Sequence, residues 1–236
     1  ERPELALLGT QGRIVDATGA AVGLVDRPLN PTAIRWFHLL DSPFIHSAVM
    51  FRRAAVEAIG GYDESFAWAQ DWDLWSRLLH RHPVANLPDR LVDYRAHAAS
   101  ATEARDPARY RPLARRIIAR NVEAVLGERL AESEADLLTG FVLGVDVSEV
   151  SRFVALLARL AGAFRRREPD AASAPEPERT LAHQLDALAV RVRPPTRAAA
   201  FAVYRAGLVA DPRLLRWLQA ARVLGRLAVG PARLRR

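Results

Sequence analysis

The sequence predicts an α/β fold followed by an all-α extension, because two different patterns divide the chain. Up to about residue 104, short apolar or β-branched runs alternate with amphipathic stretches, as strands and helices do. From about residue 107 the pattern is helical throughout, apart from a stretch rich in Pro, Ala and acidic residues that favours a linker. The expected parts are a sheet-containing region at 1–104, a helical extension at 105–167, a linker at 168–178 and an Arg-rich helical tail at 179–236.

Turn and capping residues place the elements of the first region. Asn30 and Pro31 predict a helix start, with Asn as N-cap and Pro at the first helical position, and this helix should run to about Leu40. A short helix from Arg53 should end at Gly60. Strands are expected at 5–9, 13–16, 22–25, 45–51, 84–87 and 91–94.

A further helix should start near Gln70 and present a carboxylate on its apolar face. Asp71 precedes Leu74, Trp75 and Leu78 at spacings of 3, 4 and 7, which places all four on one side of a helix. Asp73 and Arg77 fall on another face, where an i,i+4 pair is expected to be a surface contact worth a few tenths of a kcal/mol. In the extension, helices are expected at roughly 107–126, 131–144, 148–166, 179–191, 197–209 and 212–228.

Composition excludes several classes of protein. The chain has 236 residues, half of them hydrophobic, which is enough for a sizeable core. It has no Cys, so disulfides, a thiol nucleophile and Cys-ligated zinc are excluded. Its apolar stretches are too short or too charged for the roughly 20 apolar residues of a membrane span, so no transmembrane helix is expected.

The net charge of +7 is concentrated in the last part of the chain. Residues 191–236 contain 11 Arg against the single acidic residue Asp211, whereas acidic residues balance or outnumber Arg before them. The chain has no Lys, and Trp217 is the only Trp in the basic tail. Without a recognisable nucleic-acid-binding motif or an aromatic platform, nucleic acid is not the expected partner.

Motif searches remove the common catalytic arrangements. The sequence has no HExxH zinc motif, no GxSxG nucleophile elbow, no GxxxxGK[ST] phosphate loop and no GxGxxG. The surviving candidates are Asp71, His97, His46 and the pair Gly60-Gly61. Each of them alone has an ordinary structural explanation, such as a helix cap or a surface position.

The order of four segments is more specific than any single residue. SPFIHSAVMFRR, GGYDESF, AQDWDLWSRL and ANLPDRLVDYRAH follow one another within roughly residues 5–100. This run resembles the second half of the catalytic domain of family 2 glycosyltransferases. Those enzymes are inverting, use nucleotide-sugar donors and have an A-type glycosyltransferase fold, so a partial Rossmann-like sheet is expected here.

The resemblance implies roles for individual residues. Asp71 matches the carboxylate that deprotonates the acceptor hydroxyl, and Gln70 stands where Glu often precedes that base. The turn Gly60-Gly61 is implied beside the donor sugar with Asp63 near it, and His46 belongs to the segment that resembles the acceptor side. His97, in the YRxH stretch, resembles the residue that helps to hold a divalent metal, Mn or Mg, on the diphosphate.

The chemistry agrees with this hypothesis, since an attacking alcohol must lose its proton and one positioned carboxylate is sufficient for inversion. The resemblance also requires an upstream half of about a hundred residues with the nucleotide-binding strands and a D-x-D metal motif. The sequence contains neither, and its one D-x-D, Asp71-Trp72-Asp73, belongs to the base helix. The expectation is a transferase that is inactive as this isolated chain, with a nucleotide-sugar donor and a polysaccharide, lipid-linked or protein hydroxyl as acceptor.

A non-catalytic role is the alternative. In it the fold serves as a binding or scaffolding module, and the basic tail docks to a membrane surface or a partner protein. The segment 212–228 has Leu and Val residues among Arg residues, a pattern that suits a membrane surface as well as a helix packed on the protein itself. The expected location is the cytoplasm, including the inner face of the membrane if the tail binds there.

Overall fold

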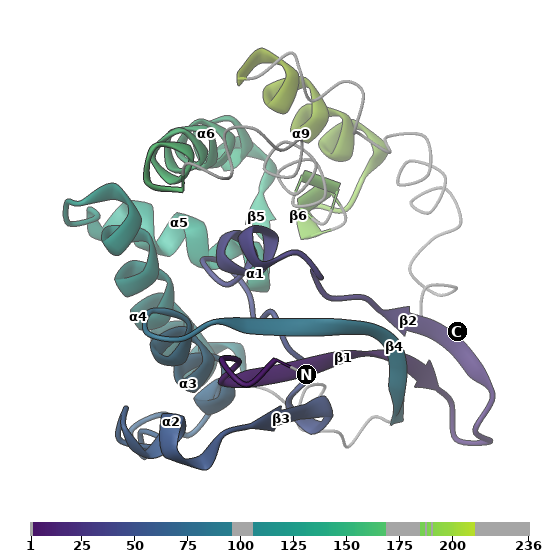
Figure 1. Cartoon of the computed structure of the whole chain (residues 1–236). Helices are drawn as coiled ribbons and strands as arrows, with labels where there is room; N and C mark the ends of the chain where they lie inside the picture. Colours follow the sequence, from purple (N-terminus) through teal and green to yellow (C-terminus); the bar gives the residue numbers. More distant parts are fainter. Residues whose placement is uncertain (1, 96–105, 169–184, 187, 190, 211–236) are drawn as a thin grey trace. The chain divides into compact units, whose positions relative to one another are not determined.

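The computed structural model describes residues 2–95, 106–168, 185–186, 188–189 and 191–210 (Figure 1). The fold is mixed α/β, in agreement with the class that the sequence predicts. The chain forms two compact units, one ending at Ile117 and the other beginning at Ile118. The boundary lies inside helix α4, Pro107–Leu126.

The first unit is built on a mixed four-stranded sheet, in which each of the three remaining strands pairs with β1, Leu7–Val15 (Figure 1). The long strand β4, Val84–Arg95, runs parallel to β1. The strands β2, Ala21–Val25, and β3, Val49–Phe51, are antiparallel to β1. Because β1 contacts all three partners, residues far apart in sequence are brought to a common layer.

Two pairs of expected strands are each one continuous strand. The runs 5–9 and 13–16 merge into β1, and the runs 84–87 and 91–94 merge into β4. The second pair is joined through Pro88. In the structure Asn86 pairs with Gly9 and Arg90 with Gln11, so Pro88 lies in an irregular part of the ladder. A residue without an N–H is tolerated there, since no ladder bond is required of it.

The expected helix starts of the first unit are confirmed. The Asn30 side chain accepts hydrogen bonds from the amides of Thr32 and Ala33 at the start of α1, Pro31–Phe37. This helix ends three residues before the expected Leu40. The strand expected at 45–51 is also shorter, because a 3₁₀ turn, η1, occupies His46–Ala48 and leaves only β3 as strand.

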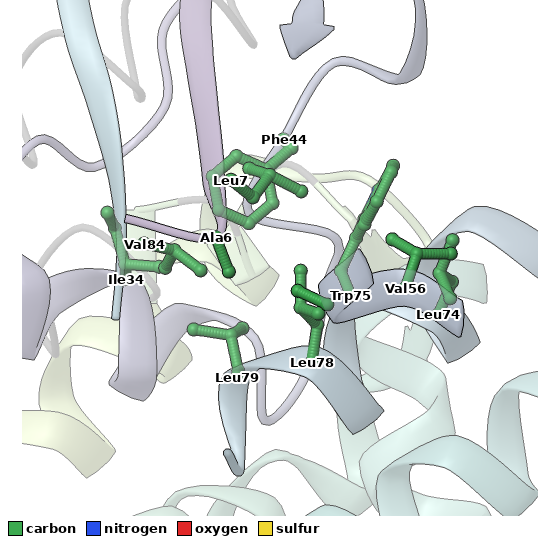
Figure 2. Packing of buried hydrophobic residues seen from close by; sticks show 11 residues of the cluster. Ala6, Leu7, Ile34, Phe44, Val56, Leu74, Trp75, Leu78, Leu79 and Val84 are labelled. Carbon is green, nitrogen blue, oxygen red and sulfur yellow. The ribbon is translucent and has the colours of Figure 1, made fainter. Parts of the chain in front are cut away.

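Helix α3, Gln70–Leu79, contributes Leu74, Trp75, Leu78 and Leu79 to the hydrophobic core cluster of the first unit. Leu74, Trp75 and Leu78 are completely buried, as the helical spacing predicts. Figure 2 shows their side chains with residues of the sheet and its connections. The cluster contains Ala6, Leu7, Ile34, Phe44, Ala55, Val56, Leu74, Trp75, Leu78, Leu79 and Val84. Burial of this size stabilises each large side chain by about 1.5–3 kcal/mol, which anchors α3 firmly.

The second unit is mainly helical. Helices α5, Glu132–Leu143, α6, Val150–Arg167, and α9, Arg197–Ala210, match three expected helices within two residues. The prediction of an all-α extension is wrong in one respect, because Val145–Asp146 (β5) and Val192–Arg193 (β6) form a short parallel ladder. A two-residue strand is too short to produce a sequence pattern.

Several expectations fall outside the described residues. These are most of the linker at 168–178, most of the helix expected at 179–191, the helix expected at 212–228, and His97. None of the helices that the structure describes is long and apolar enough to cross a membrane.

Candidate functional site

The start of α3 has an unusual backbone. Ala69, the residue before the helix, has a φ of 57°, in the left-handed region, although it is not glycine. Such a conformation costs an L-residue about 1–2 kcal/mol. The Ala69 carbonyl nevertheless accepts the first helical hydrogen bond, from the amide of Asp73 at 2.9 Å. Strain of this kind persists where surrounding packing imposes it, and it concentrates at functional sites.

Asp71 lies in the first turn of α3 and is half-buried. One of its oxygens, Oδ1, accepts a hydrogen bond from the amide of Trp72 at 2.8 Å. A carboxylate is favoured in this turn, because the amide groups at a helix start carry partial positive charge. The side chain is therefore oriented through one oxygen, while its position leaves it accessible from solvent.

An aromatic pair lies beside this carboxylate. The hydroxyl of Tyr62 and Nε2 of His46 are 3.0 Å apart and share a hydrogen bond. Both side chains are exposed at the surface, and 42% of Tyr62 is accessible. Partial burial and, to a smaller extent, the negative charge of Asp71 raise the pKa of the Tyr62 phenol. The phenol therefore stays protonated at neutral pH and is available as a hydrogen-bonding group.

Trp75, one turn after Asp71 on the same helix face, packs against His46 of this pair. The rings of His46, Phe44 and Phe51 each lie with their centroids 6.0 Å from that of Trp75. The contacts of His46 and Phe44 are edge-to-face and that of Phe51 is tilted, and aromatic pairs in edge-to-face geometry stabilise by about 0.5–1.5 kcal/mol beyond burial. Trp75 itself is fully buried, and its indole Nε1 is a buried donor without a hydrogen-bond partner in the described part of the chain.

The segment that carries His46 is held in place by a residue of the sheet. Asn86 on β4 is buried and donates through Nδ2 to the carbonyls of Pro28 and Pro43, at 2.8 and 3.1 Å. A Cβ on Gly9 of β1 would lie 2.2 Å from the Asn86 Oδ1 atom, so only glycine leaves room for this side chain. The connection before His46 is therefore tied to two strands of the sheet.

The turn Gly60-Gly61 carries Tyr62 to this place. Both glycines have positive φ, 84° and 68°, which L-residues rarely adopt. A Cβ at either position would meet no atom within 4 Å. The glycines are thus required by the backbone conformation of the turn and not by crowding within the protein.

The expectation for Asp73 and Arg77 is wrong, because this pair is not a surface contact. The Asp73 side chain is buried, and Arg77 donates to its carboxylate through Nε at 2.9 Å. The same guanidinium donates to the carbonyls of Ile59 and Gly61, at 2.8 and 2.7 Å. The segment before α3 folds over this face of the helix, which an analysis of the helix alone could not reveal. Arg77 therefore attaches the glycine turn to the helix that carries Asp71.

The remaining predicted site residues are less tightly grouped. Gln70 is half-buried as the first residue of α3. Asp63 is exposed, and hydrogen bonds from the hydroxyl and amide of Ser65 lower its pKa. This carboxylate stabilises its own turn, and its predicted place near a donor sugar stays a prediction. The structure therefore brings together Asp71, His46 and the Gly60-Gly61 turn.

Among the residues that the structure describes, no three His, Asp or Glu side chains lie close enough to hold a metal ion together. The role of His97 as a metal ligand stays a prediction.

Tyr62 is the residue of this site that the sequence analysis did not identify. The sequence does contain a signal for this residue, because a side chain directly after two glycines in a tight turn is expected at the surface. Partnership with His46 could not be predicted, because it depends on how the Gly60-Gly61 turn and the segment with His46 meet in the folded chain.

Comparison with known proteins is informative for part of the chain. No family model matches it. The chain is similar to the amylovoran biosynthesis glycosyltransferase AmsE of Erwinia amylovora, with 37% identity over 95 residues. The match covers 40% of this chain and 35% of that relative. The chain thus spans only about a third of the length of the relative that it matches.

Proposed function

We propose that the chain is part of an inverting glycosyltransferase of the family 2 type, with an A-type fold and with Asp71 as general base. The observation that carries the proposal is the position of Asp71. Its carboxylate is half-buried and accepts a hydrogen bond from the amide of Trp72, and its charge helps to raise the pKa of Tyr62, whose phenol is hydrogen-bonded to His46. The similarity to a glycosyltransferase agrees with this chemistry.

In the proposed reaction the acceptor is a hydroxyl group and the donor is a nucleotide sugar. The acceptor oxygen forms a bond to the anomeric carbon while its proton passes to a carboxylate oxygen of Asp71. The bond between the anomeric carbon and the diphosphate breaks, and its electron pair leaves with the nucleoside diphosphate. Because attack and departure occur on opposite faces of the anomeric carbon, one displacement inverts its configuration.

The other predicted residues have supporting roles in this proposal. Gly60-Gly61 shapes the donor side, with Asp63 nearby, and Gln70 borders the base. A divalent Mn or Mg would neutralise the leaving diphosphate, with His97 helping to hold it. No proton transfer assigned to Asp71 depends on that ion.

The test compares Asp71→Asn with the wild type in the native polypeptide. Purified protein is supplied with a panel of nucleoside diphosphate sugars and glycan acceptors, and release of nucleoside diphosphate is measured. Loss of the base should reduce turnover by about 10²–10⁴-fold. Asp26→Asn is the matched control, because Asp26 is an exposed aspartate paired with Arg90 away from α3. Full turnover of Asp71→Asn would remove this residue from the mechanism.

The charge of the tail favours a second candidate function, a module that docks on an anionic membrane or a partner. Residues 191–236 hold 11 Arg and one acidic residue. Replacing Arg213, Arg216, Arg222 and Arg226 with Gln should abolish sedimentation with phosphatidylserine vesicles if the tail is an anchor. Phosphatidylcholine vesicles are the control. Equal sedimentation of both proteins would exclude this role.

A further inference from the structure

The outer face of α9 has few of the polar residues that a helix surface facing water normally carries. Phe201 is 59% accessible and Val209 is 81% accessible. The exposed residues of this helix are Arg197, Ala198, Phe201, Arg205, Val209 and Ala210. On α6 of the same unit, by contrast, every exposed residue except Ala155 is Ser or Arg. A helix with apolar residues on both sides is typical of a helix that a second partner covers.

The opposite face of α9 is already packed, so the outer face is not needed for the core. The inner residues Ala199, Ala200, Val203, Tyr204 and Gly207 are buried. The helix packs against α6 on this side. At Gly207 the approach is so close that an added Cβ would lie 2.6 Å from a side-chain carbon of Leu185. The fold therefore fixes α9 through its inner face and leaves Phe201 and Val209 available for another contact.

Apolar and cationic side chains alternate along the outer face. Arg197, Phe201, Arg205 and Val209 follow one another at intervals of four residues, which places them in one row on the helix surface. The stretch 191–210 contains no acidic residue, so neither of these Arg residues has a partner for an ion pair within the helix. An arginine can lay its aliphatic part among apolar groups while its guanidinium reaches a phosphate. This pattern is typical of helices that lie in a membrane interface.

Charge complementarity favours an anionic lipid surface as the partner. Residues 191–236 hold 11 Arg against one acidic residue, so the field around α9 attracts anions. A bilayer offers phosphate groups and, directly below them, an apolar layer, which matches both kinds of side chain in the row. The helix has 14 residues and is thus about 21 Å long, shorter than the ~30 Å of a hydrocarbon core. It suits a position along the membrane plane.

We propose that the outer face of α9 docks on an anionic lipid bilayer. Phe201 and Val209 enter the apolar layer, and Arg197 and Arg205 bind lipid phosphates. The inference rests on the membrane-docking candidate above and adds to it a surface outside the Arg residues of the segment 212–228.

Fluorescent labels at single positions test which face meets the membrane. The chain has no Cys, so one introduced cysteine in the full chain takes the environment-sensitive dye NBD at one place. Phe201→Cys and Val209→Cys carry the dye on the outer face of α9, and Ala155→Cys carries it on the exposed side of α6. Vesicles of phosphatidylglycerol and phosphatidylcholine in equal amounts should brighten the dye and shift its emission to the blue at 201 and 209, but not at 155. Vesicles of phosphatidylcholine alone should change none of them.

Sedimentation with the same vesicles measures the contribution of each group. Phe201→Ser should weaken binding about tenfold or more through the lost apolar contact. Phe201→Trp keeps an aromatic side chain and should bind like the wild type. Arg197→Gln combined with Arg205→Gln should weaken binding by about 25-fold, at about fivefold for each cation near an anionic surface.

The matched control for charge is Arg129→Gln combined with Arg152→Gln, which removes two exposed arginines of the second unit outside α9. This variant should bind much better than the α9 pair. Equal loss in the two double variants would overturn the assignment to α9, because net charge alone would then explain binding. Circular dichroism of each variant checks that the helices remain folded.

The outcomes distinguish this surface from the Arg-rich tail. If the wild type bound vesicles while the dye at 201 and 209 did not respond, the α9 surface would be overturned and the tail would stand as the anchor. If the dye responded and the variant with Gln at 213, 216, 222 and 226 sedimented like the wild type, the tail would fail and the α9 surface would stand. An equal response of the dye at 155 would also overturn the proposal, since it would show contact without a defined face.

Discussion

Asp71 and Asp73 are two residues apart on α3, yet they lie in opposite environments. Asp71 is half-buried on the face that Tyr62 and His46 share, and its charge acts on the Tyr62 phenol. Asp73 is fully buried and is paired with Arg77. In the sequence both are acidic residues in the first turn of one helix. The comparison shows that chain packing against each face, and not residue type, decides whether an acidic side chain on α3 is accessible or is buried in an ion pair.

The two faces also depend on each other. Arg77 binds Asp73 and, through the carbonyl of Gly61, the turn that presents Tyr62. The buried pair is thus the support for the accessible site. Changes on the Asp73 face should lower stability, whereas changes on the Asp71 face should alter chemistry with little effect on stability.

The largest effect is expected from Asp73→Ala. It leaves the Arg77 guanidinium without its buried partner, and breaking a buried pair in this way destabilises by about 3 kcal/mol or more. Asp71→Ala is the matched variant and should cost less than about 1 kcal/mol, since it removes a helix-start carboxylate that is only half-buried. Urea unfolding followed by circular dichroism measures both. Equal losses would contradict the distinction between the two faces.

A smaller loss is expected from Arg77→Lys. Lysine keeps the charge but cannot reach Asp73 and the carbonyls of Ile59 and Gly61 with one planar group. Loss of two of these hydrogen bonds should cost about 2 kcal/mol. The Tyr62 ring should also become more mobile, as shown by its NMR linewidth. Wild-type stability in this variant would show that the fork geometry of Arg77 is unimportant.

Gly61→Ala should cost about 1–2 kcal/mol through backbone strain, because the φ of 68° is unfavourable for alanine while the space around it is open. Gly162→Ala is the matched control. It lies within α6, where an added Cβ would make only an ordinary contact, and alanine should stabilise the helix by about 0.5–1 kcal/mol. Thermal unfolding of the two variants should therefore shift in opposite directions.

The smallest effect concerns the titration of Tyr62. Burial is the main cause of its raised pKa and the charge of Asp71 is the second. Asp71→Asn removes a negative charge that disfavours the phenolate, so the pKa of Tyr62 should fall, yet it should stay above the ordinary value because burial remains. Tyrosine ¹³C NMR between pH 8 and pH 12 measures this, and Tyr62→Phe assigns the signal. An unchanged pKa of Tyr62 in Asp71→Asn would show that the two groups do not interact.

Local sequence signals predicted most elements of the fold. Asn30 and Pro31 start a helix through their own side-chain and ring geometry, and the spacing of Leu74, Trp75 and Leu78 predicts the buried face of α3. The joining of strands across Pro88 was not predicted, because it depends on the ladder with β1. Local geometry is encoded within a few residues, whereas pairing is decided by partners far along the chain.

For the candidate site, the sequence by itself determined which groups are available: a carboxylate at a helix start, a turn that needs glycine, and a histidine in the preceding segment. Only the tertiary structure decided that Tyr62 bonds to His46, that His46 packs against Trp75, and that Asp73 is buried and paired with Arg77, which also binds the glycine turn. The physical reason is that burial and charge pairing are set by the second surface that covers a helix. That surface is formed by other segments of the chain, and the periodicity of apolar residues in a helix does not indicate where those segments lie.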